Sequence, residues 1–90
     1  MMPYIKKTDR PKFDMWIDGL LGELMNENNI HQLAGNLNYI ITRLMIGTKP
    51  EKYHDFNELI GILECAKLEL YRRRVAPYED KKIAENSDVE

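Results

Sequence analysis

Apolar side chains recur at alternating steps of three and four residues along two long stretches of this sequence. The members of the two rows are Ile30, Leu33, Leu37, Ile40 and Leu44, then Phe56, Leu59, Leu63, Ala66 and Leu70. An α-helix turns once every ~3.6 residues, so this spacing places each row along one face of a helix. No stretch alternates between apolar and polar residues for long enough to indicate a β-strand. The sequence therefore predicts an all-α fold.

We predict three main helices followed by a short fourth one. Their expected ranges are residues 11–25, 30–46, 55–75 and 78–86. A connection of roughly eight residues joins the second helix to the third, and such short connections make consecutive helices antiparallel neighbours. We therefore expect a helical hairpin of the second and third helices, with the N-terminal helix packed across it. Residues 1–86 would form a single helical domain, and residues 87–90 would form a frayed tail.

Residues that start or stop helices set these limits. Pro11 suits the first turn of a helix, where the missing N–H is not needed. Gly47 is expected to adopt the left-handed conformation that ends the second helix. Asp55 and Glu58 form a capping pattern at the start of the third helix. Pro77 is expected to end that helix, because proline disfavours helical geometry in the residue before it.

Composition excludes several classes of protein. Ninety residues fit one domain, and a single cysteine excludes both an internal disulfide and a zinc site built from cysteines. With 13 Lys and Arg against 15 Asp and Glu, no overall field favours a nucleic acid or a membrane surface. The sequence has neither an apolar run of membrane-spanning length nor a secretory signal, so we expect a soluble cytoplasmic protein.

Residues suited to metal binding or nucleophilic catalysis are few and scattered. His31 and His54 lie near the starts of two different helices, without the spacing that ligates a metal from one helix face. Cys65 lies in the middle of a predicted helix, far in sequence from either histidine that could act as its base. We therefore predict no catalytic residue, no metal and no cofactor.

Carboxylates leave one enzyme alternative open. Small all-α hydrolases bind Mg²⁺ and nucleotides through pairs of glutamates that face each other across helices. Here Glu64 and Glu69 are five residues apart and do not share a helix face. Asp14 and Asp18 are one turn apart, a spacing that is common on solvated faces. A Mg²⁺-dependent nucleotide hydrolase is thus an alternative with little support.

Exposed aromatic and arginine residues indicate interaction surfaces. Tyr39, Arg43 and Ile46 project from the otherwise polar side of the second helix, and interface centres favour such a composition. The third and fourth helices contribute Tyr71, Arg72, Arg73 and Tyr78. A domain this small buries only ~60% of its unfolded surface, so additional burial by a partner would stabilise it. We therefore expect an interaction or adaptor module that self-associates, most simply as a two-fold dimer, or binds another protein.

Basic residues support an alternative function in nucleic-acid binding. Lys6, Lys7, Arg10 and Lys12 cluster near the N-terminus, and three arginines occupy positions 72–74. If the two clusters converge in space, they could hold phosphates while tyrosines stack on bases. Against this function, a glutamate at position 69 stands three and four residues before Arg72 and Arg73, which favours local pairing.

The segment Pro77-Tyr78-Glu79-Asp80 has two open interpretations. In one, Tyr78 packs back on the third helix while Glu79 or Asp80 pairs with Arg73 or Arg74. In the other, the segment is a recognition surface for another protein.

Three motifs resemble those of a family of small uncharacterised proteins from bacteria, archaea and phages. The first is Pro3-Tyr4-Ile5 followed by Asp9-Arg10 and Phe13-Asp14, and the second is Leu37-Asn38-Tyr39-Ile40-Ile41-Thr42-Arg43-Leu44. The third runs from Glu64-Cys65-Ala66-Lys67-Leu68-Glu69-Leu70-Tyr71-Arg72-Arg73 through Val75-Ala76-Pro77-Tyr78-Glu79-Asp80 to Lys82-Ile83. The resemblance implies a prokaryotic or phage setting and a compact stand-alone domain. It implies no activity, ligand or catalytic residue.

Overall fold

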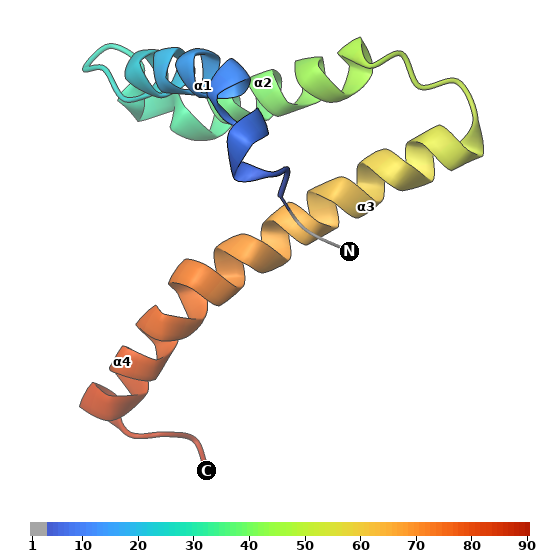
Figure 1. The fold of residues 1–90 in the computed structure, drawn as a ribbon. Helices are drawn as coiled ribbons and strands as arrows, with labels where there is room; N and C mark the ends of the chain where they lie inside the picture. The colour runs from blue at the N-terminus through green and yellow to red at the C-terminus, as the bar shows by residue number, and fades with distance from the viewer. Residues whose placement is uncertain (1–3) are drawn as a thin grey trace. The chain divides into compact units, whose positions relative to one another are not determined.

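Helices make up nearly all of the regular structure in residues 4–90, the part of the chain that the computed structural model describes. The α-helices are α1 (Pro11–Leu24), α2 (Leu33–Gly47), α3 (Tyr53–Leu70) and α4 (Ala76–Asn86), shown in Figure 1. Those residues contain no β-strand, so the predicted all-α fold is confirmed. Pro3, the first residue of the N-terminal motif, lies outside the described residues.

The chain divides into two compact units, which we describe separately. The N-terminal unit is Met1–Glu51, and the C-terminal unit is Lys52–Glu90. Because the predicted hairpin pairs α2 of one unit with α3 of the other, it stays a prediction. The single domain over residues 1–86 and the frayed tail over residues 87–90 also stay predictions.

A hairpin of α1 and α2 forms the N-terminal unit. These two helices contact each other, and a turn with a short 3-10 helix, Ile30–Gln32, connects them. Their observed limits lie close to the predicted ranges, although residues 30–32 are 3-10 rather than α-helical. Leu24, at the end of α1, is 7% exposed and is the one buried residue among residues 4–90. The core of this unit is therefore small and centred where the two helices meet the turn.

The predicted role of Gly47 at the end of α2 is wrong. Gly47 is the last residue of the helix and does not have a positive φ; instead Lys49 adopts the left-handed conformation, with a φ of 60°. Thr48, the residue that follows the helix, caps its end because its hydroxyl donates a 2.7 Å hydrogen bond to the carbonyl of Met45. The Lys49 N–H then bonds to the carbonyl of Ile46 at 2.9 Å. Side-chain capping by Thr48 thus moves the left-handed position two residues beyond the glycine.

Replacing Lys49 by glycine should stabilise the N-terminal unit by about 1 kcal/mol. A left-handed conformation costs a residue with a Cβ roughly that much, whereas glycine adopts it freely. Denaturant unfolding followed by Trp16 fluorescence would measure the effect, because the only tryptophan lies in α1 of this unit. Lys49→Ala is the matched control, since alanine keeps the Cβ. A glycine variant that is no more stable than the alanine variant would contradict the expectation.

The start of α3 is two residues earlier than predicted. Asp55 occupies the third helical position, and its Oδ2 accepts a 3.2 Å hydrogen bond from the Lys52 N–H. A carboxylate at this position is half of a capping box and also complements the helix dipole. The capping interaction predicted for Asp55 and Glu58 is therefore corrected to one between Asp55 and the backbone of Lys52.

The predicted end of the third helix at Pro77 is also wrong. A π-helical turn, Tyr71–Val75, joins α3 directly to α4, so the chain stays helical through Asn86 (Figure 1). In that turn the Ala76 N–H bonds to the carbonyl of Tyr71, five residues back instead of four. Proline has no N–H and its ring collides with the carbonyl four residues before it, here that of Arg73. The wider turn accommodates Pro77 without ending the helix.

Candidate interaction surfaces

Two of the three α2 residues predicted for an interaction surface contact each other. Arg43 Nη1 donates a 2.7 Å hydrogen bond to the Tyr39 hydroxyl, and its guanidinium carbon lies 5.6 Å from the centre of the Tyr39 ring. The two residues are one helical turn apart, which brings their side chains together. Ile46 lies further along the same helix and is exposed. Arg43 thus orders an exposed aromatic ring on α2.

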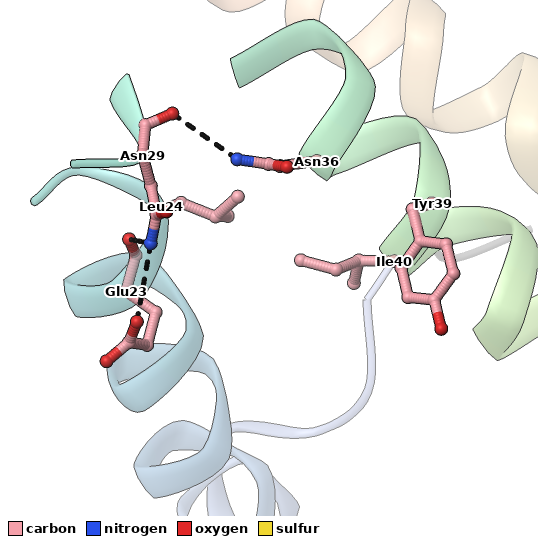
Figure 2. A pocket seen from close by; sticks show the side chains of 6 residues that line it. All are labelled: Glu23, Leu24, Asn29, Asn36, Tyr39 and Ile40. Carbon is pink, nitrogen blue, oxygen red and sulfur yellow. Dashed lines mark hydrogen bonds between the residues drawn. The ribbon is translucent and has the colours of Figure 1, made fainter. Parts of the chain in front are cut away.

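A hollow of about 200 Å³ opens beside Tyr39 where α1 and α2 meet. Its lining includes Leu24 and Ile40, which point toward one another from the two helices in Figure 2. The other lining residues are Glu23, Asn29, Asn36 and Tyr39. This hollow was not predicted, because the residues that form it are far apart in sequence and most are polar.

Asparagines hold the turn beside this hollow. The Asn29 side chain donates to the Glu23 carbonyl at 2.8 Å, and the Asn36 side chain donates to the Asn29 carbonyl at 3.3 Å (Figure 2). Asn26 Oδ1 accepts from the Asn29 N–H at 3.0 Å. Asparagine commonly closes turns through such bonds to the backbone. The Asn26-Glu27-Asn28-Asn29 run indicates a turn in the sequence, but nothing in the sequence identifies Asn36 as a partner.

On the C-terminal unit, one glutamate pairs with both of the arginines that we predicted for an interaction surface. Glu69 accepts hydrogen bonds from Arg72 Nε at 2.9 Å and from Arg73 Nε at 3.0 Å. This local pairing matches the spacing of three and four residues noted in the sequence. It offsets part of the positive charge that a phosphate-binding cluster would need.

Tyr71 is tied to Glu79 across the π-helical turn. The Tyr71 hydroxyl donates a 2.8 Å hydrogen bond to Glu79 Oε1, eight residues further along the chain. One of the two interpretations of this segment gives Glu79 or Asp80 an arginine partner, whereas this bond to Glu79 comes from a tyrosine. Tyr78 is exposed, with Lys82 Nζ 5.6 Å from the centre of its ring. The hydrogen bond between Tyr71 and Glu79 therefore connects the start of the π-helical turn to α4.

The π-helical turn explains how residues eight apart can meet. Each residue of an α-helix advances the side-chain direction by about 100°, so residues seven apart nearly align and residues eight apart do not. The π-helical turn holds one extra residue, so a separation of eight across it acts as a separation of seven. The same shift aligns Tyr78 with the row Phe56, Leu63 and Leu70, whose members are seven apart. The apolar row of α3 thus continues into α4.

A hydrogen bond and nearby negative charges raise the pKa of the Tyr71 hydroxyl. Its pKa lies above the usual 10.0, first because its hydroxyl donates to the Glu79 carboxylate, and then because the negative charge of Glu79 opposes the formation of a phenolate. Partial desolvation and the charge of Asp80 act in the same direction. The neutral phenol is therefore the form that the folded protein favours.

Tyr71→Phe should remove a tyrosine ionisation step that lies above the ordinary range. Because the pKa is raised on folding, the stabilisation from this hydrogen bond is complete below about pH 10 and is lost as the pH rises through the folded-state pKa. Ultraviolet absorbance titration would detect the step, and unfolding at pH 8 and pH 11 would detect the stability difference. Tyr53→Phe is the control, since Tyr53 is 86% exposed. A high-pH step that persists in Tyr71→Phe would contradict the assignment.

The basic residues near the N-terminus belong to a different unit from the arginines at positions 72–74. Among them, Arg10 Nε donates to the Ile5 carbonyl at 3.2 Å, and its guanidinium lies 5.9 Å from the centre of the Tyr4 ring. A hollow of about 410 Å³ lies beside these residues and is also lined by Phe13, Asp14 and Ile17. Arg10 therefore orders the segment that precedes α1.

Within the described residues, no group of three or more His, Cys, Asp or Glu side chains is placed to hold a metal ion. Cys65 is a free thiol and is partly exposed. His54 Nδ1 lies 3.1 Å from Asp55 Oδ1, at the start of α3. None of the helices described in residues 4–90 combines the length and the apolar character that crossing a membrane requires.

Comparison with known protein families gives a match over nearly the whole chain. A family model described as "Domain of unknown function (DUF6899)" matches residues 2–89. No curated protein and no solved structure matches the chain.

Proposed function

The chain belongs to the DUF6899 family, and from this premise we propose that it is a small, non-enzymatic helical interaction module that self-associates. One observation carries the proposal: the C-terminal unit is a single continuous helical run, and the apolar row of α3 lies along it. A single helix has no second element in its own unit against which to bury such a row. The row therefore needs a partner from outside the unit, either α2 in the predicted hairpin or, as we propose, a second chain.

The N-terminal unit gives separate support. Met15 and Trp16 of α1 are 69% and 67% exposed, although α1 packs against α2. Large exposed apolar patches on soluble proteins mark binding sites, and tryptophan and methionine are enriched in interfaces. Each unit therefore exposes apolar side chains that its own helices do not bury. This exposure favours a function in binding.

The molar mass in solution tests the proposal directly. Light scattering after size-exclusion chromatography should give a mass that rises with concentration toward twice the chain mass of 10.6 kDa. Leu63→Lys should lower this mass, because it puts a charge in the apolar row. Leu68→Lys is the matched control, since Leu68 is 55% exposed and lies outside the row on the same helix. A mass of one chain at every concentration would overturn the proposal.

Two alternatives have less support. Nucleic-acid binding would use the N-terminal basic cluster and the three arginines, but Glu69 engages Arg72 and Arg73. Salt-dependent retention on DNA or RNA would favour this alternative. Thermal stabilisation by Mg²⁺ with a nucleotide would favour the hydrolase alternative. The prokaryotic or phage setting and the cytoplasmic location stay predictions.

A further inference from the structure

We infer that the partner of the C-terminal unit is the same unit of a second chain, which packs antiparallel to it about a two-fold axis beside Ala66 and Lys67. This inference rests on the proposed self-association and adds the surface and the orientation. It concerns the helical run from Tyr53 to Asn86, which consists of α3, the π-helical turn and α4.

The apolar row sets the position of the axis. Phe56 and Tyr78 lie near the two ends of the row, and Leu63 and Leu70 lie between them. In an antiparallel pair centred beside residues 66 and 67, Phe56 of one chain faces Tyr78 of the other, and Leu63 faces Leu70. Each of the four side chains Phe56, Leu63, Leu70 and Tyr78 then meets another large apolar side chain. Ala66 lies at the centre, where a small side chain allows two helices to approach closely.

The π-helical turn is needed for this match. Without the extra residue, Tyr78 would point about 80° away from Leu70, the last member of the row in α3; with it, the two directions differ by about 20°. Tyr78 therefore aligns with the row, and the Tyr71–Glu79 hydrogen bond fixes the two segments in that register. The turn therefore extends the apolar row to the full length that a self-complementary pair requires.

Charge favours the antiparallel orientation. Residues 53–66 contain three acidic residues and no Lys or Arg, whereas residues 67–86 contain six basic and four acidic residues. Two copies side by side in the same direction would place like charges together. Reversing one copy places the acidic half of each run against the basic half of the other, which lowers the electrostatic energy of the pair.

The area available is that of a weak to standard interface. Five large side chains on this side are exposed, namely Phe56, Ile60, Leu70, Tyr71 and Tyr78. With roughly 100 Å² from each, two copies would bury on the order of 1,000 Å² before the aliphatic stems of charged residues are counted. Specific interfaces begin near ~1,200 Å². The pair of 34-residue runs therefore offers an area at the low end of the range for specific interfaces, where weak and transient pairs lie.

Distance measurement between two labelled chains tests the orientation. In a Cys65→Ser background, His54→Cys would carry a spin label at a side chain that is 83% exposed and outside the apolar row. An antiparallel pair separates the two labels by about 35–40 Å, at ~1.5 Å per residue from the axis. A parallel pair brings the labels within about 20 Å of each other, a result that would overturn the inference.

A second substitution tests the axis itself. Ala66→Cys in the same background should form a covalent dimer on mild oxidation, because both copies of residue 66 lie beside the axis within disulfide reach. His54→Cys should remain monomeric on the same gel, since its two copies are far apart. Circular dichroism of each variant checks that the helices are intact.

The outcomes separate this inference from the proposed function. Self-association that occurs with a short separation at residue 54, or that resists Leu63→Lys, would overturn the antiparallel surface and leave the interaction module standing. The absence of any self-association at all concentrations would overturn both. A long separation at residue 54 together with oxidation at residue 66 would support both.

Discussion

Leu24→Ala should lower the free energy of unfolding of the N-terminal unit by about 2–4 kcal/mol. Leu24 is the one buried side chain among residues 4–90, and it fills the contact between α1 and α2. Removing three carbons from a buried leucine loses transfer free energy and leaves a void. A hollow of about 200 Å³ already adjoins Leu24, so we place the expected loss in the lower part of the range seen for such substitutions.

Denaturant unfolding followed by Trp16 fluorescence would measure this loss in the unit that contains Leu24. Met15→Ala is the matched control, because it shortens an apolar side chain of the same helix that is 69% exposed. The control should change the free energy of unfolding by less than about 0.5 kcal/mol. Equal losses in the two variants would show that Met15 is buried by a partner in solution, and would remove the special role of Leu24.

Pro77→Ala should stabilise the helix and weaken self-association in the same protein. Alanine supplies an N–H that can bond to the carbonyl of Arg73, and it removes the ring that collides with that carbonyl. The π-helical turn is then no longer required, and the free energy of unfolding of the helical run should rise by up to about 3 kcal/mol. The regular helix would rotate α4 by about 100° relative to α3, which moves Tyr78 out of the apolar row.

Three measurements follow the effect of Pro77→Ala. The thermal midpoint from circular dichroism should rise, the raised pKa of Tyr71 should fall toward its usual value, and the molar mass at a fixed concentration should fall. Lys81→Ala is the control, because it changes an exposed residue of α4 without touching the π-helical turn. A Tyr71 pKa that stays raised in Pro77→Ala would mean that the proline is not the cause of the turn.

Helix positions could be predicted from the sequence because they depend on local spacing. The predicted range 11–25 matches α1 closely, and the range 30–46 matches α2 with its preceding 3-10 turn. The predicted helix ends are wrong where a residue that usually stops a helix competes with a neighbouring interaction that changes the local geometry. After Gly47 the Thr48 hydroxyl caps the end of α2, and at Pro77 a wider turn removes the collision that would otherwise end the helix.

The interaction surfaces were predictable only in part. The Tyr39–Arg43 contact and the pairing of Glu69 with two arginines both lie within one turn of a helix, so spacing alone indicates them. The hydrogen bond from Tyr71 to Glu79 was missed, because eight residues span the wrong angle on a regular helix. The Asn36 contact was missed because it joins a helix to a turn seven residues earlier.

By itself, the sequence determined the helical character of the chain, the approximate limits of its helices and the one-turn contacts along them. These features depend on backbone geometry that repeats every few residues, and the spacing of side chains along the sequence follows the same repeat. Only the tertiary structure decided that Leu24 is the buried contact of the N-terminal unit and that α3 continues into α4 past a proline. Both depend on atoms brought together by packing or by a change of helical register, which spacing along a regular helix does not encode.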